Sequence, residues 1–212
     1  NIATLMITDI DEDKLKLKEK IKSSLKKLIN ETLINQHGEE YIFLTDDEQD
    51  INREIKNLVL EEDKVKRNLA EYIFEDLYDV KKYNYSRIYD FTFNRKMDEK
   101  NYGNQTSSIG INILSPLSVD YDKSEQELMM MSMDSKDIIV RLSGDDSYVE
   151  QIEEALRIEE YNARQRFSEL PENIQNILNS KRAEMRERRN RAKDLLEDAL
   201  KKSTIYMNGN QI

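Results

Sequence analysis

Apolar residues recur every three or four positions in three stretches of the first 80 residues, and this spacing predicts three helices. The first stretch lies within a lysine-rich segment at 14–27, and a break near 60–63 separates the second stretch from the third. The apolar positions are Leu17, Ile21, Leu25 and Leu28, then Ile51, Ile55 and Leu58, then Val65, Leu69, Ile73 and Leu77.

Two short apolar runs, 32–34 and 41–44, follow the first helix and predict a β-hairpin with Gly38 in its turn. A helix followed by such a hairpin resembles the end of a winged-helix unit. The lysines at 14–27 suit nucleic-acid phosphates, but Glu39 and Glu40 at the hairpin tip would repel them. We therefore favour a winged helix that packs against protein over one that reads DNA.

The apolar spacing changes to two after residue 83, which predicts strands with one buried face each. The alternating positions are Tyr89, Phe91 and Phe93 in one strand and Ile109, Ile111 and Ile113 in the next. We expect a hairpin between these strands, with a long polar loop at 94–108 and an end at Pro116. Further strands are predicted at 138–142 and at 204–207, the latter ended by Asn208-Gly209.

The segment 146–202 is almost wholly helical in pattern, with Pro171 marking a kink or a new helix. Its second half has a heptad-like seam that predicts a helical hairpin or an imperfect coiled coil projecting beyond the core. The seam consists of Ile174, Leu178, Lys181, Met185, Arg188, Ala192, Leu195 and Ala199.

Together these patterns predict an α+β chain that is mostly helical. We expect a winged-helix-like unit at 1–45, a small α/β body at 46–145, a long antiparallel, coiled-coil-like helical arm at 146–203 and a returning strand at 204–212. The composition agrees, because 38% hydrophobic against 36% charged residues in 212 is lean for a compact globule and typical of solvated helices.

A net charge of −10 argues against nucleic-acid binding over the whole surface, but one stretch is basic. Two glutamates, Glu184 and Glu187, interrupt it, and it could follow a nucleic-acid backbone. We favour a solvated helix face that pairs with the glutamates of the preceding helix, at 150–160. The candidate contact residues are Lys181, Arg182, Arg186, Arg188, Arg189, Arg191 and Lys193.

The sequence contains no catalytic or nucleotide-binding motif. It has no cysteine and one histidine, and its five glycines do not form a phosphate-binding loop. The run from Tyr41 to Glu48 resembles an apolar strand ending in a Walker B acidic pair, but a capping box between Thr45 and Glu48 explains it better. Asp145 and Asp146 are adjacent carboxylates with no further ligand at a set spacing, which is a weak signal for a metal site. We expect them to begin a helix. We predict no cofactor, no metal site and no enzyme activity in this chain.

The apolar runs, the cysteine content and the first residues of the chain bear on the cellular location of the protein. No run approaches the roughly 20 apolar residues of a membrane span, and the absence of cysteine suits a reducing cytosol. The chain begins with Asn1 rather than Met and has no signal-peptide pattern, so we expect a cytoplasmic fragment of a larger protein.

Three segments carry a family resemblance. The stretch from Tyr41 to Ile55, the group Phe93-Asn94-Arg95 with Asp98 and Tyr102-Gly103, and the terminal Ile205-Tyr206-Met207-Asn208-Gly209 resemble the large P-loop ATPase of BREX phage-defence systems, of the BrxC/PglY type. The resemblance implies a bacterial protein of over a thousand residues that binds ATP and Mg²⁺ in a module N-terminal to this region. None of that module's nucleotide-binding residues maps onto this chain.

The resemblance implies a non-catalytic interaction or scaffolding region of that ATPase. Its expected partners are the other BREX proteins, which include a DNA methyltransferase, or a second copy bound through the helical arm. The alternative is a nucleic-acid-binding module that contacts DNA through the basic stripes at 14–27 and 181–193. No membrane partner is expected.

Overall fold

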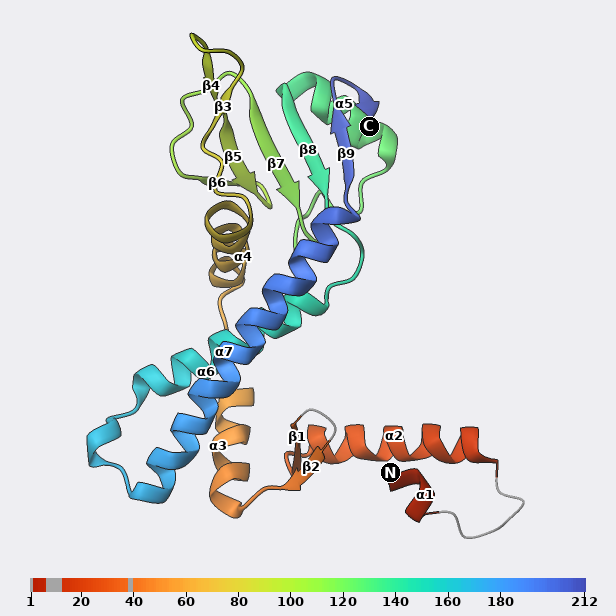
Figure 1. Cartoon of the computed structure of the whole chain (residues 1–212), viewed down its shortest axis with the longest axis vertical. Helices are drawn as coiled ribbons and strands as arrows, with labels where there is room; N and C mark the ends of the chain where they lie inside the picture. Colours follow the sequence, from red (N-terminus) through yellow and green to blue (C-terminus); the bar gives the residue numbers. More distant parts are fainter. Residues whose placement is uncertain (1, 7–12, 38–39) are drawn as a thin grey trace. The chain divides into compact units, whose positions relative to one another are not determined.

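A computed structural model describes residues 2–6, 13–37 and 40–212, and it divides into two compact units (Figure 1). The N-terminal unit comprises residues up to 58 together with 167–177, and the sheet unit comprises 59–166 and 178–212. The long helix α7 (Glu172–Lys201) contributes its first residues to the N-terminal unit and the remainder to the sheet unit. Helices account for more residues than strands, as the sequence predicts.

The N-terminal unit contains the predicted helix and hairpin. After α1 (Ile2–Leu5), helix α2 (Lys14–Asn30) begins at Asp13, whose carboxylate accepts from the backbone N–H groups of Leu15 and Lys16. Such a cap satisfies donors that a helix start leaves without partners. Ile21 is buried on the apolar face, and strands β1 (Ile34–His37) and β2 (Glu40–Phe43) pair antiparallel.

Helix α3 (Asp46–Lys56) confirms the capping box. The Thr45 hydroxyl accepts from the Glu48 N–H at 3.3 Å, and the Glu48 carboxylate accepts from the Thr45 N–H at 2.8 Å. The acidic residues after Thr45 therefore occupy the first turn of a helix, where negative charge is favourable. Asp47 also accepts from the side-chain amide of Asn173, which follows the short 3₁₀ turn η2 (Phe167–Glu169).

The sheet unit is built on six strands in the order β10-β9-β8-β7-β5-β6. Strands β5, β7 and β8 are parallel, whereas β6, β9 and β10 pair antiparallel with their neighbours. Helix α5 (Glu125–Ser135) connects β7 to β8 and packs on one face of the sheet. The strands are β5 (Asn94–Met97), β6 (Lys100–Tyr102), β7 (Gly110–Leu114), β8 (Asp137–Arg141), β9 (Thr204–Met207) and β10 (Asn210–Gln211).

Helices α4 (Glu62–Glu71), α6 (Ser147–Arg164) and α7 supply most of a second, larger core, with the π-helical turn η1 (Tyr72–Leu77) and part of the sheet. Parts of both predicted arm helices therefore belong to the core of the sheet unit, and a projecting, coiled-coil-like arm stays a prediction. Apolar residues of both helices are buried in this core. They include Ile152, Leu156, Ala192, Leu196 and Ala199.

The predicted hairpin between residues 89–93 and 109–113 is wrong. Strand β4 (Asp90–Thr92) pairs instead with β3 (Lys82–Asn84) in a separate two-stranded ribbon, and its Phe91 is 48% exposed. The loop at 94–108 contains its own hairpin, β5–β6, which reverses the chain and lets β7 run parallel to β5. Alternation shows which residues share a strand face but not whether another element covers that face.

Candidate interaction surfaces

The buried part of the basic stripe on α7 is centred on a glutamate of the same helix. The carboxylate of Glu184 lies 2.6 Å from the Lys181 ammonium and 2.8 Å from the Arg188 guanidinium, which also donates to Gln151 of α6. Burial alone would raise the pKa of Glu184, but the two cations hold it below its ordinary value. Lys181 is only 8% exposed, so this cluster belongs to the fold.

Two further cations of the stripe form ion pairs within the sheet unit. Arg189 lies 2.8 Å from Glu159 of α6, which supports the predicted pairing with that helix. Lys193 lies 2.6 Å from Asp76 and over the ring of Tyr72. The other glutamates proposed as partners, Glu150, Glu153, Glu154 and Glu160, lie on the same helix, and three of them contact Arg157, Arg164 or Lys64.

The remaining members of the stripe lie closer to the solvent. Arg182 donates to the side-chain oxygen of Asn179 at 3.3 Å, whereas Arg186 and Arg191 are exposed. The stripe is therefore divided between fold-stabilising ion pairs and a smaller solvent-facing set.

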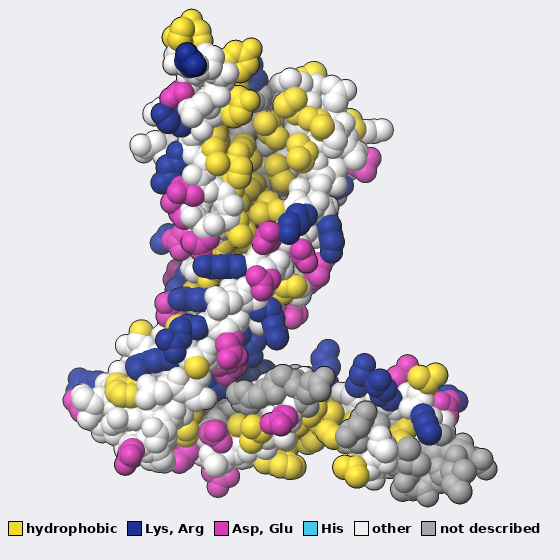
Figure 2. Space-filling view, viewed as in Figure 1, with side chains coloured by type: hydrophobic (Ala, Val, Ile, Leu, Met, Phe, Trp, Pro, Cys, Tyr) yellow, Lys and Arg dark blue, Asp and Glu magenta, His cyan; other side chains and the backbone are white. Residues whose placement is uncertain are grey.

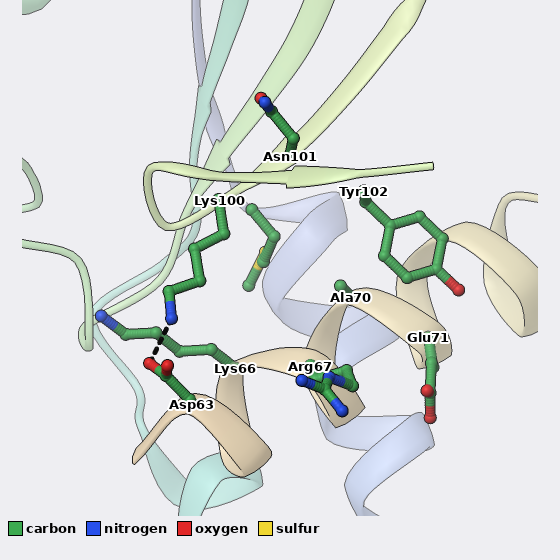
Figure 3. Close-up of a pocket in the computed structure, with 9 residues that line it drawn as sticks. Asp63, Lys66, Arg67, Ala70, Glu71, Lys100, Asn101 and Tyr102 are labelled. Carbon is green, nitrogen blue, oxygen red and sulfur yellow. Dashed lines mark ion pairs between the residues drawn. The ribbon is translucent and has the colours of Figure 1, made fainter. Parts of the chain in front are cut away.

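A pocket of about 260 Å³ lies between α4 and β6 (Figure 3). Lys100 reaches from β6 to Asp63 of α4 and closes one end of the pocket with an ion pair. Lys66 beneath it is 8% exposed and pairs with Glu62 at 2.8 Å. Burial opposes its charge, but Glu62 raises the pKa of Lys66 above its ordinary value, so its ammonium stays protonated. Charges of both signs line this pocket, and Asp63, Lys66 and Lys100 among them form ion pairs.

The turn between β5 and β6 is anchored by a buried carboxylate. Asp98 and Glu99 have φ values of 46° and 66°, as a two-residue turn of type I′ requires. The Asp98 carboxylate is fully buried and accepts from the N–H and hydroxyl of Ser115, at 2.7 and 2.6 Å. Burial raises the pKa of Asp98, while the two bonds from Ser115 act against that rise. Glu99 accepts from the hydroxyl of Ser118, which fixes the turn to the segment after β7.

The face of the sheet opposite α5 carries an apolar groove of about 430 Å³. Figure 2 shows hydrophobic side chains gathered in this hollow. One wall is the π-helical turn η1, through Phe74, Leu77 and the following Tyr78, and the other is the end of α7 around Leu200. The floor consists of Ile111, Ile113, Ile138, Val140 and Ile205.

Strand β8 explains why the groove is apolar. Ile139 is 1% exposed and packs in the cluster beneath α5, whereas Ile138 and Val140 on either side of it line the groove. Parallel strands are normally covered on both faces, and their sequences are then apolar on both faces. The continuous apolar run Ile138-Ile139-Val140 is the sequence signal that could have indicated this groove.

The methionine-rich helix α5 divides between core and surface. Met129 and Met131 pack against the smaller core, while Met130 and Met133 are 61% and 59% exposed. At the start of α6, Asp145 rather than Asp146 accepts from the Ser147 N–H, at 3.0 Å.

The described ranges, 2–6, 13–37 and 40–212, hold neither a membrane-spanning helix nor a cluster of metal-ligating side chains. In these ranges, no helix is long and apolar enough to cross a membrane. The same residues contain no group of three or more acidic or histidine side chains placed to hold a metal ion.

A family model described as the fourth domain of the BREX ATP-binding protein BrxC, with a six-stranded β-sheet, matches residues 58–212. The chain belongs to this BrxC family. The matched range begins at the boundary of the sheet unit and contains all six strands of its sheet. No solved structure matches the chain.

The family match confirms the resemblance to a BREX ATPase. Two of the three segments that carried it, around Asn94 and at Ile205–Gly209, fall within the matched range, whereas Tyr41–Ile55 precedes it. In the BrxC fourth domain these segments form β5 with its turn and the hairpin β9–β10. Asn208 and Gly209 have φ values of 49° and 76°, which makes the Asn-Gly pair the turn of that hairpin.

Proposed function

We propose that this chain is a non-catalytic interaction region of a large, cytoplasmic BREX phage-defence ATPase, and that another BREX protein docks in the groove opposite α5. ATP and Mg²⁺ would bind elsewhere in the full ATPase. The observation that carries the proposal is the apolar groove left on this face of the parallel sheet, between η1 and the end of α7. The N-terminal helix and hairpin would act as a winged-helix-like unit that packs against protein, and α6 with α7 as a coiled-coil-like support.

The lining of the groove favours an aliphatic helix as its occupant. Five Ile and Val side chains form the floor, and helices are what cover such strands in α/β folds. The charged rim residues Glu197 and Lys201 neutralise each other at 2.8 Å, so the rim does not select for a charged partner. Burying aliphatic surface here would stabilise the complex by about 25 cal/mol per Å² before the costs of association.

The purified chain is expected to show no saturable ATP turnover, because its glycines do not form a phosphate-binding loop and no cofactor site is proposed. Phosphate release can be measured against ATP concentration, with the full ATPase as the positive control. Turnover by the chain that rises to a plateau would reject the non-catalytic assignment.

Ile138→Asp is expected to weaken binding to a co-expressed BREX partner by at least about tenfold, because it places a carboxylate on the groove floor. Co-purification with the tagged full-length ATPase would identify the BREX protein that binds. Titration of that protein against the ATPase would then measure the affinity of each variant. Val119→Asp is the matched control, since Val119 is 81% exposed and lies outside the groove.

Unchanged affinity in the Ile138→Asp variant would contradict groove docking. A thermal melt would show whether the aspartate disturbs the fold, and Ile138→Ser gives a milder change at the same site. Loss of self-association instead of partner binding, seen by sedimentation, would replace the BREX partner with a second copy of the chain.

The alternative, nucleic-acid binding through the stripes at 14–27 and 181–193, has less support. On α7, Lys181, Arg188 and Lys193 form ion pairs within the fold. Binding to duplex DNA that Arg186→Glu together with Arg191→Glu abolishes would favour this alternative.

A further inference from the structure

The ribbon β3–β4 carries four aromatic side chains on one face. Tyr83 lies opposite Phe91 in the register, and the Tyr85 N–H donates to the Tyr89 carbonyl at 3.0 Å. Cross-strand partners share a face, as do residues two apart, so all four rings lie on the same side. The rings of Tyr85 and Phe91 meet edge to face at 6.0 Å, which agrees with this placement.

This aromatic face has no cover within the described part of the chain. Tyr83, Tyr85 and Tyr89 are 62%, 70% and 63% exposed, and Phe91 is 48% exposed. Every residue of β3 and β4 is exposed, so the ribbon is not held by a core of its own. An exposed cluster of large rings on one surface marks a binding site more often than a chance arrangement.

The turn of the ribbon offers an exposed cation to an anionic partner. Residues 81–92 contain three cations and one acid, in a chain whose net charge is −10. The acid, Asp90, lies on the opposite face and is paired with Lys82 at 2.6 Å. Lys81 is held by Glu75 and Asp79, whereas Arg87 in the turn is exposed. The ribbon thus combines four exposed rings with an exposed cation in its turn, and the carboxylate of Asp90 lies on the opposite face.

We propose that the aromatic face of the β3–β4 ribbon binds single-stranded nucleic acid. Unpaired bases would stack on Tyr83, Tyr85 and Tyr89, and Arg87 would contact the phosphate backbone. Exposed rings interspersed with cations are the features by which proteins bind single strands without reading sequence. A duplex keeps its bases stacked on each other, so it would bind more weakly. This inference goes beyond the proposed function and uses a surface distinct from the groove.

The test uses the complete chain and fluorescently labelled oligonucleotides of about 15 nucleotides, a length that spans known single-strand sites. Fluorescence anisotropy would compare oligothymidine, oligouridine and a mixed-sequence duplex. We expect saturable binding of a single strand and at least about tenfold weaker binding of the duplex. The oligothymidine and oligouridine arms distinguish DNA from RNA as the source of the strand.

Substitutions then separate base stacking from general hydrophobic contact. Joint replacement of Tyr83, Tyr85 and Tyr89 by Leu keeps apolar surface but removes stacking, and we expect at least a tenfold loss of affinity. Joint replacement by Phe should retain binding. Arg87→Ala should reduce the slope of the logarithm of the binding constant against the logarithm of the salt concentration by about one, the loss of one phosphate contact. Phe43→Ala, an exposed aromatic on the other hairpin at 82%, is the control and should leave binding unchanged.

Three results would overturn the proposal: no binding of either single strand, equal binding of the duplex, or full affinity in the triple Leu variant. If the triple Leu variant instead lost a co-purified BREX protein while no oligonucleotide bound, the ribbon would be a protein-docking surface. Ile138→Asp should not change oligonucleotide binding. The two proposals, nucleic-acid binding by the ribbon and protein docking in the groove, can therefore be rejected independently of each other.

Discussion

Asp98→Ala is expected to lower the free energy of unfolding of the sheet unit by about 3 kcal/mol. The substitution leaves the buried N–H and hydroxyl of Ser115 without their acceptor. It also places alanine at a φ of 46°, where an L-residue without a local hydrogen bond is strained by roughly 1–2 kcal/mol. Urea unfolding followed by circular dichroism would measure the loss, which should lower the melting temperature by roughly 10 °C.

Asp98→Asn is the matched control for this experiment. It keeps an oxygen that can accept from Ser115, and asparagine tolerates the left-handed region, so the expected loss is below about 1.5 kcal/mol. An Asp98→Ala variant as stable as the Asn variant would show that the buried acceptor does not matter.

The same residue gives a pH dependence with a defined sign. Burial raises the pKa of Asp98 in the folded state above its ordinary value of 3.8, so the folded state holds a proton that the unfolded state has lost. The stabilisation of the folded state that this raised pKa provides is therefore complete when the pH lies below 3.8. It declines as the pH rises through the folded-state pKa. The stability advantage of the native chain over Asp98→Asn should shrink as the pH rises from about 4 through the folded-state pKa. An advantage that grows over this interval would contradict the assignment.

Phe74→Ala is expected to cost about 4 kcal/mol of unfolding free energy, the range typical of a buried phenylalanine. Phe74 is 0% exposed and its ring stacks on Tyr102 at a centroid distance of 5.4 Å. The Arg95 guanidinium lies over both rings and also donates to the Phe74 carbonyl. Removing the ring leaves a cavity beside the groove and uncovers the guanidinium.

Phe43→Ala provides the comparison, because Phe43 is 82% exposed and should change the stability by no more than about 0.5 kcal/mol. Thermal melts of both variants would measure the difference. Similar melting temperatures for the two would mean that Phe74 does not support the core as described.

The helices were predictable because each carries its own evidence in the spacing of its apolar residues. Ile21 and Ile51 are buried on the faces that the sequence indicated, and the Thr45 capping box is local to one turn. Lys181 was placed in the apolar seam by spacing alone. Its burial depends on Glu184, three residues away, and the sequence presented that residue only as an interruption of the basic run.

The candidate surfaces were harder to predict because they depend on what covers a strand. Tyr89 and Phe91 alternate like residues of a half-buried strand, yet they belong to a two-stranded ribbon that no other described element covers. The role of Asp98 depends on Ser115, which lies 17 residues away along the chain. Neither the missing cover of the ribbon nor the distant donors of Ser115 leave a periodic signal in the sequence.

The two edges of the sheet restrict how the domain can associate. The outermost strands, β6 and β10, have three and two residues, so each edge offers few unpaired backbone groups to another strand. Short edges of this kind hinder strand-by-strand growth and fibre formation. We therefore expect any assembly to form through side-chain contacts at the groove and the ribbon, and not by extension of the sheet.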